Sequence, residues 1–381
     1  MLIIFREQAG NTMKISKIEL ENVKCFLNET ISLLKEGTNE PLSVCAFVGA
    51  NGAGKSTILK SIVAAFSVVD NDYQGELFTD DAVAFGERHL RVSLDLEINR
   101  NEKSIINYDE THIELIYQHI TDEEYESLIH EKDNNDEENI EVEKDILYIP
   151  SDISDTCFKQ YPNAILALLW KEQVGLIMYY DSFRFVSNKN PVGPNLQQIK
   201  SSKESALSSN LNKNGENCYR DLDLKQWIVN MDYTRLKEPT RRNKAIYNHM
   251  IKAFELLFHP LKFETINQNG NIMFKNEEDG QQLSVDMLSD GFKSIFSIVL
   301  DIMRRLALAP DFDNEEFYMK EAVILIDEID CHIHPKWQRK LVPAFRELFP
   351  NCQFIFTTHS PYILDSLQSY EIKKVGERTI I

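Results

Sequence analysis

A glycine-rich segment has the residue types of a phosphate-binding loop. Gly49 to Ser56 reads Gly-Ala-Asn-Gly-Ala-Gly-Lys-Ser, which fits the pattern G-x-x-x-x-G-K-[ST] in full. Glycines let successive backbone N–H groups converge on a phosphate, and the start of the following helix adds partial positive charge. We expect Lys55 to pair with the β- and γ-phosphates of ATP, and the Ser56 hydroxyl to hold Mg²⁺. The residues expected to bind ATP are Gly49, Ala50, Asn51, Gly52, Ala53, Gly54, Lys55, Ser56 and Thr57.

Two adjacent carboxylates end an apolar segment further along the chain. Glu321 to Glu328 reads Glu-Ala-Val-Ile-Leu-Ile-Asp-Glu, a buried strand that delivers Asp327 and Glu328 at its end. We expect Asp327 to hold Mg²⁺ directly or through water, and Glu328 to accept a proton from, or orient, the water that attacks the γ-phosphate. A plain buried strand ending in surface acids is the alternative, and the complete phosphate loop weighs against it. His332 and His334 follow without a third soft ligand at suitable spacing, so we expect structural or interface roles for them.

Strands and helices alternate at both ends of the chain, as positioning these residues requires. Hydrophobic spacing predicts strands at Ile15–Glu21, Ser43–Val48, Leu90–Ile98, Glu321–Asp327 and Gln353–Thr357. It predicts helices at Lys55–Phe66, Trp227–Phe258, Phe292–Leu308 and Lys336–Leu348, and a largely helical, polar middle after residue 145. This alternation indicates an α/β fold whose sheet is divided by an insertion. No internal repeat and no sustained heptads are visible, which excludes a long coiled coil.

Composition and charge exclude several classes of protein. The 381 residues, 43% hydrophobic, can bury a sizeable core and form one large or two moderate domains. No apolar stretch approaches the roughly 18 residues of a membrane span, and Met1–Phe5 lacks the features of a secretory signal. The six cysteines form no CxxC pair, so we expect reduced thiols in a cytoplasmic protein. Asp122–Asp145 carries twelve acidic and two basic residues, a net of −10 within a total of −19, and we expect a solvated segment there.

Three further motifs resemble those of ABC-type ATPases. Leu288-Ser289-Asp290-Gly291-Phe292-Lys293-Ser294 resembles the ABC signature, and Thr357-Thr358-His359-Ser360-Pro361 resembles the switch-histidine segment. The opening strand Ile18–Phe26 is similar to that of RecF-, SMC- and OLD-like ATPases. The resemblance implies an ABC-ATPase head, with a P-loop NTPase sheet flanked by helices and an inserted, mainly helical subdomain. It also implies Mg²⁺-dependent ATP hydrolysis, with His359, Lys55 and Glu328 as catalytic residues.

The resemblance also implies an assembly. Ser289, Asp290 and Gly291 are expected to act in trans on the ATP held by a partner subunit, in a head-to-tail homodimer or a larger assembly. The segment from Ile326 to Gln338, together with the switch segment, resembles the stand-alone ATPases of bacterial anti-phage systems of the Septu, retron-associated and OLD-like types. Only twenty residues follow Pro361, so we expect no Toprim nuclease domain and a separate effector protein, most simply a nuclease.

Several alternatives stay open at this stage. A RecF-like DNA repair ATPase is the main one, and a transporter nucleotide-binding subunit or an ATP-binding scaffold fits less well. The basic cluster, defined as Arg235, Lys237, Arg241, Arg242 and Lys244, could contact nucleic acid or be a solvated helix face. The Gln-loop has two candidates, Gln118 and the segment Tyr180–Arg184.

We predict a three-part organisation for the chain. Residues 13–120 form the N-terminal part of the ATPase core, 121–254 the acidic segment and mainly helical insertion, and 255–381 the C-terminal part of the core. The segment Ser187–Asn217 has the composition of a loop. Because Met13-Lys14-Ile15 begins the first convincing strand, we expect Met1–Thr12 to be an extension or a mis-assigned start.

Overall fold

The computed structural model describes nine ranges of the chain. These are residues 12–67, 82–99, 111–120, 146–149, 156–160, 176–182, 224–267, 271–308 and 315–376. The predictions for Met1–Asn11, for the acidic run Asp122–Asp145 and for the loop Ser187–Asn217 lie outside the described residues.

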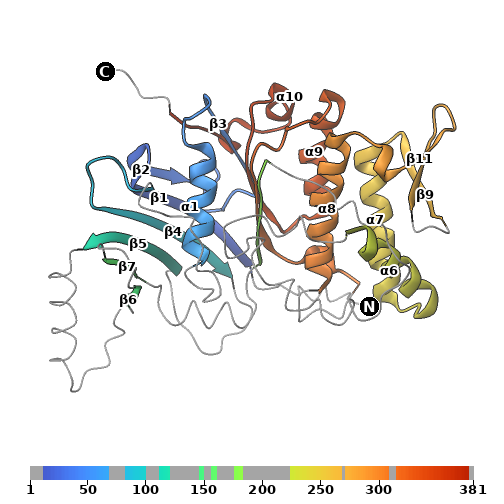
Figure 1. Cartoon of the computed structure of the whole chain (residues 1–381), viewed down its shortest axis with the longest axis horizontal. Helices are drawn as coiled ribbons and strands as arrows, with labels where there is room; N and C mark the ends of the chain where they lie inside the picture. The colour runs from blue at the N-terminus through green and yellow to red at the C-terminus, as the bar shows by residue number, and fades with distance from the viewer. Residues whose placement is uncertain are drawn as a thin grey trace, which may run out of the picture.

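A five-stranded parallel sheet stands at the centre of the fold (Figure 1). Its order is β14 (Ile372–Lys374), β3 (Val44–Val48), β13 (Gln353–Thr357), β12 (Ala322–Ile326) and β8 (Leu176–Tyr180). All four neighbouring pairs run parallel. Every residue of β12 and β13 is buried, as expected for strands that are covered on both faces. The expected strands at 43–48, 321–327 and 353–357 are thus neighbours, with their carboxyl ends at one edge.

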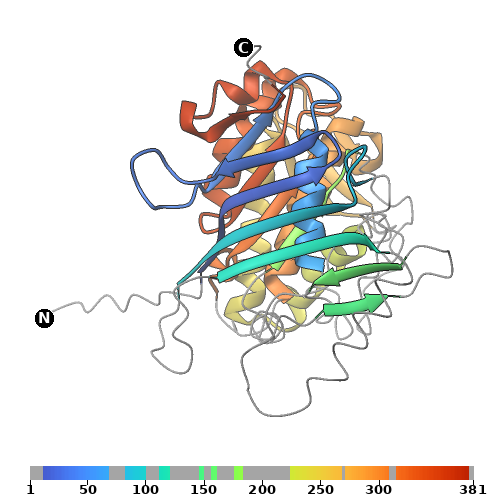
Figure 2. The same cartoon turned by 90° about the vertical axis from the view of Figure 1, so that its left-hand side faces the viewer.

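A six-stranded antiparallel sheet lies beside it (Figure 2). Its order is β2 (Phe26–Ser32), β1 (Thr12–Val23), β4 (His89–Asn99), β5 (Thr111–Ile120), β7 (Thr156–Gln160) and β6 (Ile146–Ile149). The helix α1 (Lys55–Ser67) lies between the two sheets (Figure 1). Its apolar residues therefore contact strands on both sides, which explains why Ile58, Leu59 and Ile62 are all fully buried.

Strand alternation sorts the parallel sheet into two cores. Val323 and Leu325 of β12 join the core around α1, whereas Ile324 and Ile326 join the core of the helical layer. The other strands divide in the same way, because successive side chains of a strand point to opposite faces. The central sheet is therefore fixed in register by two independent apolar layers.

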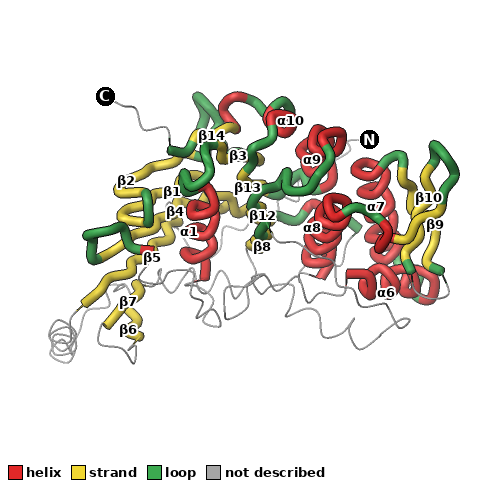
Figure 3. The backbone as a smooth tube through the Cα atoms, turned by 45° about the horizontal axis from the view of Figure 1, so that its top comes forward, coloured by secondary structure: helices red, strands yellow, loops and turns green. Residues whose placement is uncertain are grey.

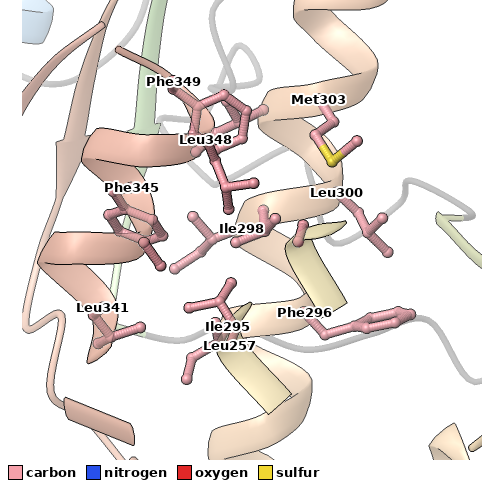
Figure 4. Close-up of a cluster of buried hydrophobic side chains, with 14 of the residues drawn as sticks. Leu257, Ile295, Phe296, Ile298, Leu300, Met303, Leu341, Phe345, Leu348 and Phe349 are labelled. Atoms are coloured by element: carbon pink, nitrogen blue, oxygen red, sulfur yellow. The ribbon is translucent and has the colours of Figure 1, made fainter. Parts of the chain in front are cut away.

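Helices cover the opposite face of the parallel sheet (Figures 1 and 3). They are α6 (Leu224–Lys237), α7 (Arg241–Phe258), α8 (Asp290–Leu308), α9 (Pro335–Leu348) and the short α10 (Pro361–Leu364). Leu257 of α7, Ile295 and Ile298 of α8, and Leu341 and Phe345 of α9 meet in one cluster (Figure 4). A three-stranded antiparallel sheet completes this side, formed by β9 (Leu261–Ile266), β10 (Ile272–Asn276) and β11 (Gln282–Ser284). Short 3₁₀ turns occur at Val285–Met287, Phe317–Met319 and Ser369–Glu371.

The α/β fold expected from the sequence is confirmed, with two differences in its elements. The prediction of helix directly after the acidic run is wrong where the structure describes that stretch, since Ile146–Ile149, Thr156–Gln160 and Leu176–Tyr180 are strands. The expected helix Trp227–Phe258 is two helices, because Pro239 interrupts the hydrogen-bond ladder between α6 and α7. The boundaries of the three-part division stay a prediction. Within the described ranges, no helix combines the length and apolar character needed to cross a membrane.

Two polar side chains, the fully buried Gln353 and the partly buried Glu321, connect the sheets at the amino ends of the parallel strands. The Met13 N–H donates to Glu321 Oε2 at 2.7 Å, and the Ile15 N–H donates to Gln353 Oε1 at 2.8 Å. Gln353 Nε2 in turn donates to the carbonyls of Ile15 and Leu42. These bonds hold β1 against the starts of β12 and β13. Burial raises the pKa of Glu321 to about 7, although the Met13 N–H and the nearby Lys14 favour its ionised form.

This raised pKa predicts a loss of stability as the pH rises. The folded state holds the Glu321 proton more tightly than the unfolded chain, whose pKa is near 4.5. The contribution is therefore fully present below about pH 4.5 and is lost as the pH rises through about 7. Glu321→Gln keeps an oxygen that accepts the Met13 N–H, but it cannot ionise. We therefore expect the melting temperature of the variant, relative to that of wild type, to be higher at pH 8.5 than at pH 5.5. A difference between the two proteins that does not change with pH would contradict this assignment.

Candidate functional site

The glycine-rich segment connects β3 to α1, as the sequence predicts. Packing requires glycine at two of its positions. A Cβ on Gly49 would lie 2.3 Å from the Val375 carbonyl oxygen, and one on Gly54 would lie 2.5 Å from Phe26 Cζ. Gly54 also has φ +97°, and Gly52 has φ +79°, which other residues adopt only with strain. The loop is thus held between the β1–β2 turn and the end of β14.

Lys55 begins α1 and folds back over the loop. Its side chain is buried, and Nζ donates to the carbonyls of Gly49 at 3.0 Å and Ala50 at 2.9 Å. An ammonium has three N–H donors, so one remains for a phosphate oxygen after these two bonds. Ser56 and Thr57 follow on the first turn of α1, partly exposed, where backbone N–H groups of a helix start are also directed outward. Asn51 and Gly52 are exposed at the loop tip.

Asp327 and Glu328 follow β12 at the same edge of the sheet. Thr357, the last residue of β13, donates its hydroxyl to Asp327 Oδ1 at 2.6 Å and accepts the Glu328 N–H at 2.7 Å. The Asp327 N–H donates to the Tyr180 carbonyl at 2.8 Å, which joins this turn to β8. Glu328 has φ +46° and an exposed side chain. A left-handed conformation at a glutamate costs about 1 kcal/mol or more. Here the turn is held in it because the Asp327 N–H bonds the Tyr180 carbonyl and the Glu328 N–H bonds Thr357 Oγ1.

The switch segment after β13 is organised by Asp330 and Gln338, neither of which was assigned a role from its sequence context. Asp330 Oδ1 accepts the Thr358 hydroxyl at 2.6 Å and the His359 N–H at 3.3 Å. Gln338 of α9 accepts the Ser360 hydroxyl and donates to the Ile333 carbonyl at 2.8 Å. His359 itself is exposed. The only sequence signal for the contact of Asp330 with Thr358 and His359 was its position, three residues after Asp327 on the same turn.

The signature-like residues lie where α8 begins. The Phe292 N–H donates to Ser289 Oγ at 3.3 Å, so Ser289 caps the helix. Ser289 and Asp290 are exposed, whereas Gly291 is buried against the chain that follows β12. A Cβ on Gly291 would lie 2.0 Å from the His332 carbonyl oxygen, so only glycine permits this approach. The structure thus places an exposed signature next to the turn that carries Glu328.

The two Gln-loop candidates lie in different sheets. Gln118 is in β5 of the antiparallel sheet, where its backbone pairs with His89 and Phe158. Tyr180 ends β8 directly beside Asp327, and of the other residues in this candidate, Asp181 and Ser182 are described. Proximity to Asp327 favours the Tyr180 segment.

The residues expected to hold Mg²⁺ supply suitable ligands. Ser56 offers a hydroxyl and Asp327 a carboxylate, and hard oxygen donors of this kind suit Mg²⁺. Asp327 Oδ1 accepts a hydrogen bond from the Thr357 hydroxyl, so this oxygen is an acceptor, as a metal ligand must be. His334 caps α9, with Nδ1 accepting the Lys336 N–H at 3.3 Å, and His332 is exposed. Within the described ranges, no three His, Cys, Asp or Glu side chains form a preassembled metal site.

The basic cluster is partly engaged within the protein. Arg235 pairs with Asp232 at 2.6 Å and lies 3.8 Å from the ring centroid of Tyr247. Arg242 donates to the Ala307 carbonyl, and Arg241 lies 3.8 Å from Glu315. Lys237 and Lys244 are exposed. Arg235 therefore joins α6 to α7, and Arg242 joins α7 to α8, which leaves less of the cluster's charge for nucleic acid than the sequence indicated.

Comparisons with known proteins identify the family to which the chain belongs. The family model described as AAA ATPase domain (AAA_15) matches residues 13–364. The probable ATPase of retron Vc95 from Vibrio cholerae is 28% identical over 98% of this chain and 76% of its own length. The probable ATPase of retron Ec83 from Escherichia coli is 26% identical over 96% of this chain and 72% of its own length. The Septu protein PtuA of Bacillus thuringiensis is 26% identical over 40% of this chain and 39% of its own length.

A solved structure supports the fold. The Smc head domain with an extended coiled coil, bound to the C-terminal domain of ScpA and derived from Pyrococcus furiosus, has a TM-score of 0.51. The two are 17% identical, and the match covers 96% of this chain and 94% of the other. The central sheet and its flanking helices therefore form an SMC-head-like ATPase fold.

Proposed function

The chain belongs to the AAA ATPase domain family, and from this premise we propose that it is an ATP-driven switch that controls a separate effector in bacterial anti-phage defence. In this proposal ATP binding joins two copies head to tail, and ATP hydrolysis at the shared sites releases them. The observation that carries the proposal is the gathering of the phosphate loop, Asp327, Glu328 and the His359 segment at one edge of the parallel sheet, beside an exposed signature.

Each residue has a chemical role in this proposal. The loop from Gly49 to Thr57 binds the phosphates through backbone N–H groups, and Lys55 adds a positive charge. Ser56 and Asp327 would hold Mg²⁺, which supplies charge neutralisation on the phosphates. Glu328 orients the attacking water or accepts its proton, since its carboxylate is exposed at the sheet edge. His359 contacts the γ-phosphate from the next strand end.

The exposed signature supports the dimer. Ser289 and Asp290 face outward at the start of a helix of 19 residues, whose amino end favours a negative charge. Gly291 packs directly against the His332 carbonyl. The signature therefore lies next to the turn that carries Glu328, on the same surface. We propose that Ser289 and the Gly291 backbone reach the γ-phosphate bound to the partner's loop.

Blocking this surface is expected to prevent association without affecting the nucleotide site of the monomer. Ser289→Arg places a long cation at the contact, so we expect normal ATP affinity but no ATP-dependent dimer. Light scattering with Mg²⁺ and a non-hydrolysable ATP analogue measures the association. Lys293→Arg is a suitable control, since it keeps the charge of a neighbouring, partly exposed residue of α8. Dimerisation of Ser289→Arg with wild-type affinity would refute the assignment of the signature.

The relatives support the role in defence. Two of them are named as retron ATPases and one as a Septu protein, and the endonuclease GajA of Bacillus cereus is 22% identical over 92% of this chain and 56% of its own length. We propose that a nuclease is the effector, restrained until infection changes the nucleotide cycle. The exposed lysines of the basic cluster would sense nucleic acid, and the acidic run would dock the effector.

Purification from the native host tests the effector. Tagged wild type, Lys55→Ala and Glu328→Gln would be isolated with their bound proteins. We expect one co-purifying protein whose amount depends on the nucleotide state, and we expect cells without this gene to lose phage resistance. If nothing co-purifies in any state and resistance is normal, the defence role fails, and RecF-like DNA repair becomes the better account.

A further inference from the structure

The helix that begins at the signature contacts the end of β8 through buried polar side chains. The Tyr180 hydroxyl donates to Asp301 Oδ2 of α8 at 3.0 Å. Both residues have an exposed fraction of 0%. Tyr180 is the last residue of β8, and Asp301 lies three turns along α8, about 17 Å from its first residue at 1.5 Å per residue. Buried polar bonds of this kind are costly to break, so they fix the two elements relative to each other.

Two arginines hold the Asp301 carboxylate. Arg304 donates to Oδ1 at 3.0 Å and Arg305 to Oδ2 at 2.8 Å, and both are buried. Burial alone would raise the pKa of Asp301, but the guanidinium groups of Arg305 and Arg304 outweigh this effect and lower it. Asp301 is therefore an ionised acceptor, and its bond to Tyr180 is charge-assisted.

The same tyrosine is joined to the candidate catalytic turn through its backbone. The Tyr180 carbonyl accepts the Asp327 N–H at 2.8 Å, and Tyr180 is in register with Ile326 of β12. Its side chain thus contacts the signature helix while its carbonyl contacts the residue preceding Glu328. At the other end of this path, Gly291 lies against His332. The helix α8 therefore meets the Asp327–His332 segment both directly and through Tyr180.

We propose that Tyr180 and Asp301 are positioning residues for hydrolysis, which hold Asp327 and Glu328 in a geometry set by the signature helix. A displacement of α8 when the signature meets its ligand is carried by Asp301 to Tyr180, and by the Tyr180 carbonyl to Asp327. The pair therefore acts on the hydrolysis step and leaves nucleotide affinity to the phosphate loop. This inference rests on the proposed roles of Glu328 and the signature.

Tyr180→Phe tests the proposal with little change in packing. The ring stays in place, and Asp301 keeps both arginine partners, so we expect the protein to fold. We expect kcat for ATP hydrolysis to fall about tenfold or more, because small misplacements of reacting groups are costly, with KM and ATP affinity within about twofold of wild type. Tyr179→Phe is the matched control, since it removes a hydroxyl from the preceding, buried residue on the opposite face of β8.

The outcomes are distinguishable. A kcat loss confined to Tyr180→Phe, with the melting temperature close to that of Tyr179→Phe, supports the positioning role. Wild-type kcat in Tyr180→Phe overturns it. A joint loss of kcat, ATP affinity and melting temperature also overturns it, because the bond then serves only stability. Failure of the proposed function would differ from all of these, since wild type and Tyr179→Phe would both lack ATP hydrolysis.

Discussion

Glu328→Gln is expected to hydrolyse ATP roughly 10²- to 10⁴-fold more slowly than wild type, the usual contribution of a general base, while binding ATP normally. The amide has the shape of the carboxylate, and the bonds of the Glu328 N–H and Asp327 to Thr357 do not involve the altered atoms. The ATP-bound dimer is then expected to persist. Phosphate release and the lifetime of the dimer measure the two effects.

The same strand offers a control for this variant. Glu321→Gln makes the identical change at the opposite end of β12, where the carboxylate contacts the Met13 N–H. We expect normal hydrolysis from it. Hydrolysis at the wild-type rate in Glu328→Gln would exclude Glu328 as the residue that activates water.

Lys55→Ala is expected to lower ATP affinity by about 100-fold or more, since charge-assisted hydrogen bonds contribute about 1.5–3 kcal/mol each. The variant loses the cation that we propose pairs with the phosphates, and it leaves the Gly49 and Ala50 carbonyls without the Lys55 N–H donors. Titration with a fluorescent ATP analogue measures the loss. Lys60→Ala, an exposed position on the same helix, controls for net charge. Equal ATP affinity in Lys55→Ala and Lys60→Ala would contradict the assignment of Lys55 to phosphate binding.

Local sequence patterns predicted the elements that carry chemistry. The phosphate loop, the acidic end of β12 and the helices α1, α8 and α9 each depend on residues close together in the chain, so composition and spacing reveal them. The apolar runs at Val44–Val48 and Ala322–Ile326 were likewise predicted as strands, and the structure explains their composition, because strands covered on both faces are apolar throughout.

Contacts between distant residues could not be predicted in this way. The bond between Tyr180 and Asp301 spans 121 positions, and nothing in the local sequence marks either residue as its partner. The order of strands likewise depends on pairing across the chain, so β8 as the neighbour of β12 was missed. Short apolar runs such as Leu176–Tyr180 fit a helix or a strand equally well, and only the sheet beside them decides. Thr357 shows the same limit, since its role depends on β12 lying next to β13.

A mixing experiment tests the central claim, that two copies share their ATP sites, most directly. Lys55→Ala and Ser289→Arg would be co-expressed with different tags, and the mixed dimer would be isolated through both. In a head-to-tail dimer one site then carries both lesions and the other is intact, although each variant alone is inactive. The account predicts that the isolated mixed dimer regains about half of the wild-type ATP hydrolysis, as expected when one of two symmetric sites is restored. No recovery in a confirmed mixed dimer would contradict shared sites.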